Sequence, residues 1–329
     1  MLKTMFKKYI FIILIGITVF ISLISEASFF QSAEKHTKAA TNNFNEGSFV
    51  ASSTKAENIR IPNLCPQHYT FGAPVVVSNE AKKIARRSFY LCEENYAVQF
   101  DPATKTPLWV AERLIGSQQI DRYIKRVDNF QPHPIVPKSA QASLADYRGS
   151  KFDRGHMAPA ANMQDDFAMG QSFFLTNIVP QVGPNMNRGI WADLEAIVRK
   201  WSITRGEILV VTGPIFGPGA QTIGKSNVMV PTHLYKVVFD PKKLESIAFI
   251  MPNVQIITNK TKNLDQGNPA YPQTTPDKAI NCRRVCTIND FIVSLSDVEK
   301  YTGILFFPKL NPQQKQQISQ QIKMWPIKN

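Results

Sequence analysis

The chain has 329 residues, of which 43% are hydrophobic and 19% are charged. This balance supports a sizeable core and excludes a mostly disordered chain, and the length is enough for one large domain or two ordinary ones. The formal net charge of +13 at pH 7 favours a polyanionic partner, such as nucleic acid, anionic lipid or an acidic glycan.

The first 27 residues have the pattern of an export signal. Three lysines precede residues 9–25, which carry no charge and are rich in Ile, Leu, Phe and Val, and small residues follow at the end of this stretch. We expect residues 1–27 to be a cleaved signal peptide. Residues 9–25 also approach the length of a membrane span, so an uncleaved membrane tether is the alternative. Either interpretation predicts an exported protein, which is periplasmic, extracellular or anchored facing outside the cytoplasm.

Residues 28–62 are polar and lack apolar periodicity, so they are predicted to be a linker before a folded domain at 63–329. Four cysteines in an exported chain favour disulfides, although four cysteines allow three pairings. We expect the pairs Cys65–Cys92 and Cys282–Cys286. A zinc site is the weaker alternative, because no histidine lies at ligand spacing from the second pair.

The body of the chain alternates strand patterns with a few helical ones. Predicted strands lie at 88–91, 96–100, 107–114, 173–181, 207–214, 234–239 and 246–251. Residues 96–114 are expected to form an antiparallel hairpin, and residues 129–143 and 266–277 to be loops. One apolar helix face is formed by Ile190, Trp191, Leu194, Ile197, Val198 and Trp201. A late helix is expected to open with a capping box at Ser296 and to end at Gly303.

Residues 152–163 are the most unusual stretch of the chain. Asp153, Arg154 and His156 lie in four consecutive positions, and such side chains are costly to bury without partners. They are therefore predicted to form a site. If the partner is nucleic acid, hydrolysis of a phosphodiester needs a base, positive charge at the phosphate and help for the leaving oxygen. His156 is the best candidate base, because imidazole titrates near neutral pH.

A metal is the next requirement of such a reaction. The sequence has no compact cluster of carboxylates and histidines, but Mg²⁺ keeps several waters and needs only one or two protein oxygens. Asn187 could supply an amide oxygen, although Asn at a helix start is also a common N-cap. On one continuous helix Glu195 would lie about 80° round from Asn187, where it either reaches the water shell of the metal or is a solvated side chain.

Four blocks of sequence, in order, resemble the DNA/RNA non-specific endonucleases. That family includes secreted bacterial sugar-non-specific nucleases and mitochondrial endonuclease G. The blocks are residues 153–156, residues 175–181 with 187–195, residues 211–214 with 230–236, and residues 251–253 with 303–306. The resemblance covers about residues 88–310. It implies an α+β fold, the ββα-metal or His-Me finger fold, with a central antiparallel sheet flanked by helices. That expectation agrees with the strand-rich pattern.

The resemblance also implies roles at matching positions. His156 would be the general base that activates water. Asn187 would be the only direct protein ligand of one Mg²⁺, for which Mn²⁺ could substitute, and Glu195 would hold the water shell of that ion.

Further roles carried by the resemblance concern charge and support. Arg154 would contact the phosphate, and Arg126 would stabilise the transition state, although the preceding loop matches loosely and Lys125 is close. Asn177 and Asp153 would support the site. A homodimer is a further expectation from the family.

The sequence therefore predicts an exported, Mg²⁺-dependent nuclease that hydrolyses DNA and RNA internally with little sequence preference. The alternative is a non-catalytic nucleic-acid-binding or uptake protein on the same scaffold. Because this chain retains His156, Asn187 and Glu195, the enzyme is favoured. A lipid- or glycan-binding protein would explain the charge but not residues 153–156.

Overall fold

The computed structural model describes residues 64–77, 83, 87–120, 124–256, 258 and 286–327. The chain divides into two units, Met1–Asn58 and Ile59–Asn329, and every described residue belongs to the second. The predictions for residues 1–27, 28–62, 266–277 and Cys282 lie outside the described residues. Within the described part, no helix is long and apolar enough to span a membrane.

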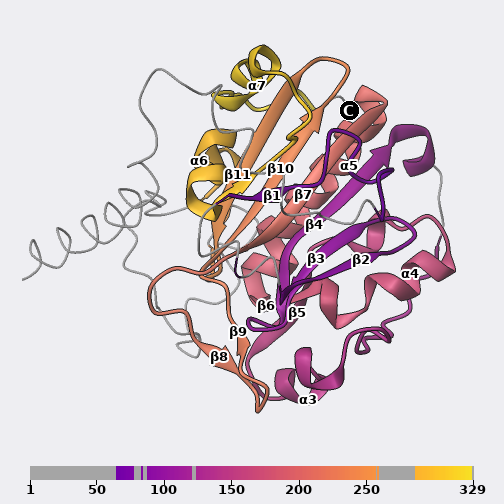
Figure 1. The fold of residues 1–329 in the computed structure, drawn as a ribbon, viewed down its shortest axis with the longest axis vertical. Coiled ribbons are helices and arrows are strands. Elements are labelled where there is room, and N and C mark those ends of the chain that lie inside the picture. The colour runs from indigo at the N-terminus through magenta and orange to yellow at the C-terminus, as the bar shows by residue number, and fades with distance from the viewer. Residues whose placement is uncertain are drawn as a thin grey trace, which may run out of the picture. The chain divides into compact units, whose positions relative to one another are not determined.

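A seven-stranded sheet forms the centre of the fold (Figure 1), with the strand order β12-β11-β10-β7-β4-β3-β2. All neighbouring strands are antiparallel. The strands are β2 (Phe89–Cys92), β3 (Ala97–Asp101), β4 (Thr106–Ile115), β7 (Glu207–Ile215), β10 (His233–Asp240), β11 (Glu245–Pro252) and β12 (Ile292–Val293). The predicted α+β class, the hairpin of β3 and β4, and the later strands are confirmed.

The two faces of the sheet belong to different cores, because side chains along a strand alternate. Val210 lies in a core with Val110 and with α5 (Ala192–Arg205). Its neighbour Val211 lies in a second core with α6 (Leu295–Thr302) and α7 (Pro312–Ser319). The predicted apolar face is confirmed, since Leu194, Val198 and Trp201 of α5 are buried in the first core and Ile197 packs against it. That core also contains the candidate site.

A ββα unit packs on this first face. It consists of β5 (Phe152–His156), its antiparallel partner β6 (Ile178–Val182), a turn at Gly183–Trp191, and α5. The predicted strand at 173–181 was wrong at both ends. Leu175–Asn177 is a 3-10 turn, and the strand continues through Pro180 to Val182. Pro180 is tolerated because it lies in a two-stranded ribbon, opposite Arg154.

The turn before α5 is not a regular helix. Gly189 has φ −128° and ψ −113°, and Asn185 has a φ of 62°. The prediction that Asn187 and Glu195 share one continuous helix is therefore wrong, because the backbone breaks between them at Gly189. The angle of about 80° that a continuous helix implies does not apply.

Shorter elements complete the fold. They are β1 (Val75–Val76), paired with β13 (Ile304–Leu305), the β8 (Thr222–Ile223) and β9 (Val228–Met229) hairpin, α3 (Leu144–Tyr147) and α4 (Asp166–Ser172). The cap of α6 is Ser294, whose capping box uses Asp297, so the predicted cap at Ser296 is two residues late. Gly303 ends α6 with a φ of 65°, as predicted.

The predicted disulfide Cys65–Cys92 is present, with the two Cα atoms 5.6 Å apart. It ties the first described segment to the end of β2. Cys286 is disulfide-bonded as well. Its predicted partner, Cys282, is outside the described residues.

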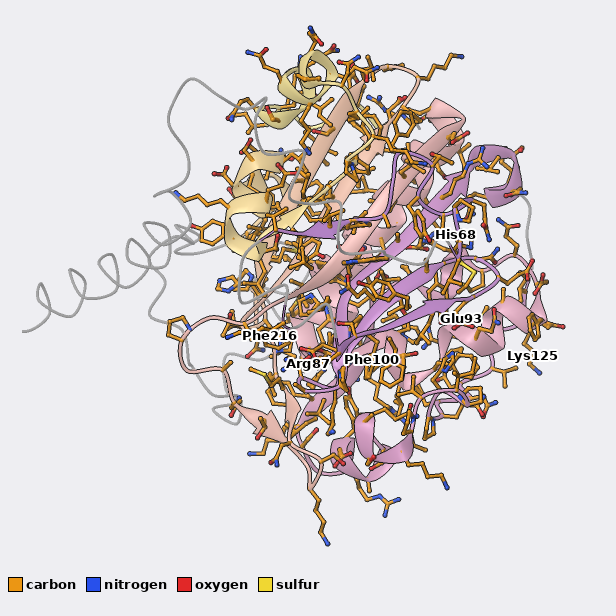
Figure 2. All side chains as sticks on the ribbon, viewed as in Figure 1. His68, Arg87, Glu93, Phe100, Lys125 and Phe216 are labelled. Carbon is orange, nitrogen blue, oxygen red and sulfur yellow. A yellow bond between two sulfur atoms is a disulfide. The ribbon has the colours of Figure 1, made fainter. Side chains whose placement is uncertain are left out.

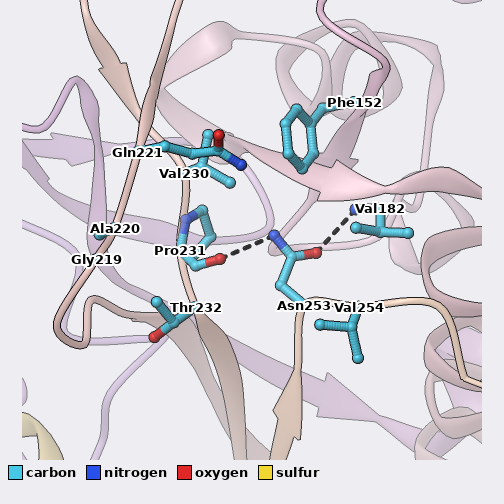
Figure 3. Close-up of a pocket in the computed structure, with 10 residues that line it drawn as sticks. All are labelled: Phe152, Val182, Gly219, Ala220, Gln221, Val230, Pro231, Thr232, Asn253 and Val254. Atoms are coloured by element: carbon cyan, nitrogen blue, oxygen red, sulfur yellow. Dashed lines mark hydrogen bonds between the residues drawn. The ribbon is translucent and has the colours of Figure 1, made fainter. Parts of the chain in front are cut away.

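Asn253, at the end of β11, ties the ribbon to the rest of the fold. Its Nδ2 donates to the backbone oxygens of Pro180 and Pro231 at 3.0 and 2.9 Å, and its Oδ1 accepts from the Val182 amide at 2.8 Å (Figure 3). The cavity beside it has a volume of about 20 Å³. This is room for roughly one water molecule. Asn253 is therefore a structural residue rather than a part of a substrate pocket.

Candidate active site

His156 ends β5 and is enclosed by aromatic rings. Its imidazole centroid lies 5.4 Å from that of Phe130 and 4.9 Å from that of Phe173. The residue is 9% exposed. Its Nε2 is buried and has no hydrogen-bond partner among the described residues. A buried ring nitrogen without a partner is costly, which points to a functional reason for keeping it.

Burial, together with the positive charges of Arg126 and Arg154, lowers the pKa of His156 to about 3, while the charge of Asp128 opposes the shift. The imidazole is therefore neutral at physiological pH. A neutral imidazole can accept a proton on one ring nitrogen.

The two arginines reach the site over the same aromatic rings. The exposed Arg154 places its guanidinium 4.1 Å from the centroid of Phe130. Arg126 lies 5.3 Å from the centroid of Phe173 and pairs with Asp128 at 2.7 Å, with 57% of its side chain exposed. Stacking on a ring holds a guanidinium in place without removing its charge. Two cationic groups thus flank His156 and remain accessible to an anion.

Asn187 and Asp153 form a hydrogen-bonded pair at the other end of β5. The Asn187 Nδ2 donates to Asp153 Oδ2 at 2.9 Å, and Arg188 pairs with the same carboxylate at 3.2 Å. This bond fixes the amide plane and directs Oδ1 of Asn187 away from Asp153. Asp153 is therefore the hydrogen-bond partner that orients Asn187.

Gly155 and Asn177 shape the backbone around the site. A Cβ at Gly155 would collide with the side chain of Gln181 on β6, so close packing inside the strand requires a glycine here. The fully buried Asn177 donates to the backbone oxygens of Ala158 and Ser172, both at 2.9 Å, and accepts from the Ala158 amide at 2.9 Å. It joins the chain after His156 to the start of β6.

Glu195 lies on α5, partly buried, above a polar network in the sheet. Burial raises the pKa of Glu195, while the charges of Lys236 and Arg199 oppose that shift. The Lys236 ammonium is 1% exposed, donates to Thr212 Oγ1 at 2.7 Å, and lies 4.8 Å from the Trp191 ring centroid. These contacts place a buried cation beneath the site.

Glu112 is the second acid of this network. It is 1% exposed and accepts a 2.8 Å hydrogen bond from Asn162, whose Oδ1 accepts from Arg199 at 3.3 Å. Burial raises the pKa of Glu112 from 4.5 to about 7, with Lys236 opposing the shift. The network links β4, the segment after His156, and α5.

This shift predicts how stability depends on pH. Because the pKa of Glu112 is higher in the folded than in the unfolded chain, its ionisation destabilises the fold as pH rises from about 4.5 to about 7, by on the order of 3 kcal/mol. Glu112→Gln keeps an acceptor for Asn162 and cannot ionise. We expect the variant to lose less stability than the native chain between pH 5 and pH 8, as measured by urea unfolding.

The control for this measurement is Glu94→Gln, which changes an exposed side chain between β2 and β3. It should follow the native pH dependence. Parallel loss of stability in the native chain and in Glu112→Gln would contradict the assignment.

The structure thus divides the predicted site residues into clusters. His156, Arg154 and Arg126 gather around two phenylalanines, Asn187 pairs with Asp153, and Asn177 supports the backbone. Sequence reasoning missed the aromatic walls and the buried network. The buried network could have been found from the sequence, because Glu112 and Lys236 are charged residues within largely apolar strands.

Comparisons with known proteins agree with this geometry. The model of the family "DNA/RNA non-specific endonuclease" matches residues 77–313. Nuclease C1 of Cunninghamella echinulata var. echinulata is 35% identical over 237 residues, covering 68% of this chain and 84% of that protein. Human mitochondrial endonuclease G is 32% identical, covering 66% of this chain and 69% of that protein.

Other relatives are longer. The human mitochondrial nuclease EXOG is 34% identical, and the match covers 67% of this chain but 57% of that protein. A solved structure of an EndoG/EndoGI complex superposes with a TM-score of 0.59 at 27% identity, covering 76% of this chain and 93% of that one. The fold, the ββα unit and these matches agree, and the chain belongs to the DNA/RNA non-specific endonuclease family, whose members are phosphodiester hydrolases.

Proposed function

We propose that this protein hydrolyses phosphodiester bonds inside both DNA and RNA, with His156 as the general base. The observation that carries the proposal is the neutral, buried Nε2 of His156, which lacks a partner among the described residues and is flanked by two guanidiniums. A base that takes a proton from water beside an anionic phosphate needs this combination.

The roles of the side chains follow from their charges. His156 accepts the proton of the attacking water on its neutral imidazole. Arg154 and Arg126 offset the negative charge of the phosphate, and both are exposed enough to meet a nucleic acid. An arriving phosphate also neutralises the charges that depress the pKa of His156, so substrate binding makes the imidazole a stronger base.

The residues fit Mg²⁺ or Mn²⁺. Among the described residues no group of three His, Cys, Asp or Glu side chains gathers as a metal site. Mg²⁺ instead takes one or two protein oxygens together with waters. Asn187 offers such an oxygen, held in direction by Asp153. Glu195 on α5, whose carboxylate is subject to the charge of Arg126, would be the acid that holds the water shell. A bound divalent ion would supply charge stabilisation at the phosphate and the leaving oxygen.

Asp153 provides a test of this metal assignment. Asp153→Ala frees the amide of Asn187 to rotate, and loss of such an orienting partner typically costs about 10–100-fold in metal affinity or activity. We expect a higher Mg²⁺ concentration at half-maximal activity, measured by titrating Mg²⁺ against plasmid cleavage. Asp153→Asn keeps an acceptor for the amide and should be affected less. An unchanged Mg²⁺ requirement in Asp153→Ala would refute this role.

Low sequence preference and export complete the proposal. The net charge of +13 supports contact with the phosphate backbone, which is independent of sequence and weakened by salt. The basic start and apolar residues 9–25 support export, by a cleaved signal peptide or as a tether. The homodimer expected from the family resemblance remains a prediction for this protein.

Cleavage assays separate the proposal from its competitors. The full-length protein is incubated with supercoiled plasmid, and separately with RNA, in Mg²⁺, in Mn²⁺ and in EDTA. We expect linearised and fragmented products from both substrates with either metal and none in EDTA. Binding without cleavage would favour the nucleic-acid-binding alternative, and full activity in EDTA would contradict the metal requirement.

A further inference from the structure

The loop at residues 124–137 builds one wall of the site. Phe130 from this loop contacts the His156 ring and stacks under Arg154, and Arg126 lies over Phe173. Residues 125–129 are all exposed, so this part of the loop has little packing of its own. The position of the wall therefore depends on where the rest of the loop is anchored.

Two features anchor the loop. The backbone of Gln131 donates to the Phe173 oxygen at 3.2 Å and accepts from the Leu175 amide at 2.9 Å, and a hydrogen bond between two buried side chains holds the loop further along. His133 Nε2 and Glu93 Oε1 are 2.8 Å apart, and each side chain is 4% exposed. No other hydrogen bond to the Glu93 carboxylate occurs among the described residues. The Ile135 amide donates to His133 Nδ1 at 3.2 Å, so the proton of the imidazole is on Nε2 and is donated to Glu93.

The two partners are each fixed to a different part of the fold. The backbone amide of His133 donates to the Gln141 side chain at 2.6 Å, and its ring packs 4.7 Å from that of Phe174. The Glu93 backbone oxygen accepts from His68 at 3.1 Å, and Glu93 directly follows the disulfide-bonded Cys92. In Figure 2, Glu93 lies toward the side of the molecule where Lys125 of this loop projects.

We propose that Glu93 and His133 are positioning residues of the catalytic site, whose buried hydrogen bond holds the 124–137 loop so that Phe130 and Arg126 stay against His156. The inference rests on the proposed role of His156 and adds a requirement to it. Displacement of a catalytic arrangement by about 1 Å can cost about 10²-fold in rate. His133 lies two residues beyond the Gln131 bridge and three from Phe130, so loss of the buried hydrogen bond leaves that bridge as the remaining support of the wall.

The test compares two substitutions of the same residue. Glu93→Leu removes the acceptor, whereas Glu93→Gln keeps a carbonyl oxygen that can accept from His133 Nε2. We expect kcat on plasmid DNA to fall about 10- to 100-fold in Glu93→Leu and to stay near the native value in Glu93→Gln. Binding of a short DNA duplex in EDTA, followed by fluorescence anisotropy, should change little in either variant.

A second readout distinguishes positioning from a merely structural role. Burial and Arg126 lower the pKa of His156 from 6.5 to about 3, so a displaced loop should raise it in Glu93→Leu. NMR titration of the imidazole in the metal-free protein measures this shift. If Glu93→Leu does not fold, the double variant Glu93→Leu/His133→Leu is used in its place, because it leaves neither partner of the hydrogen bond unpaired in the core. The same fall in kcat and the same rise in the His156 pKa are expected.

His156→Ala keeps the two proposals apart. If His156→Ala is inactive while Glu93→Leu has the native kcat and an unchanged His156 titration, the positioning role is overturned and the base assignment stands. If His156→Ala remains active, the assignment of His156 as the general base is contradicted, and the positioning role that rests on it is contradicted with it. Loss of kcat in Glu93→Leu, recovery in Glu93→Gln and a raised His156 pKa together support the inference.

Discussion

Replacement of His156 by alanine is expected to lower kcat on plasmid DNA by about 10²–10⁴-fold, the usual contribution of a general base. The physical reason is that the His156 imidazole is the neutral proton acceptor beside Arg154 and Arg126. DNA binding should persist, because it depends on the exposed cationic side chains. Steady-state cleavage and anisotropy binding in EDTA measure the two effects separately.

The control for this variant is His233→Ala on β10. The His233 imidazole contacts Thr232 Oγ1 at 3.1 Å at the start of β10, whereas His156 lies between the Phe130 and Phe173 rings. It should cleave plasmid at a rate close to the native one. Plasmid cleavage by His156→Ala at a near-native rate would remove the base from the mechanism.

Replacement of Asn187 by alanine is expected to raise the Mg²⁺ concentration needed for half-maximal activity and to lower the rate at saturation. It removes the oxygen that Asp153 directs, so the loss should be at least the 10–100-fold that follows loss of an orienting partner alone. Mg²⁺ titrations of plasmid cleavage, and Mn²⁺ binding followed by electron paramagnetic resonance, report the two effects.

Asn185→Gly is the matched control, since it removes an amide two residues away. Asn185 has a φ of 62°, a conformation that glycine adopts without strain. The control should need no more Mg²⁺ than the native protein. If both variants responded to Mg²⁺ alike, Asn187 would not be the metal ligand.

Much of the fold could be predicted because its patterns are local. Alternating apolar residues identified the hairpin of β3 and β4, and the spacing of Trp191 and Trp201 identified the buried face of α5. Gly303 ended its helix where expected because a left-handed cap favours glycine. The sequence blocks around His156 and Asn187 were sufficient to identify the family.

The errors arose where distant contacts decide the local structure. The break at Gly189 depends on how the turn packs, so the helical angle between Asn187 and Glu195 could not be known from spacing. The need for Gly155 is visible only once Gln181 is placed on the neighbouring strand. His133 received no role because its partner, Glu93, lies 40 positions earlier in the chain.

The Asn253 side chain protects the edge of β6 against aggregation by strand pairing. In the two-stranded ribbon, Pro180 and Val182 present their outward backbone groups on the side away from β5, and Asn253 binds the oxygen of one and the amide of the other. Pro180 has no N–H to offer a further strand. The β6 edge of this two-stranded sheet is thereby closed to edge-to-edge pairing with another chain.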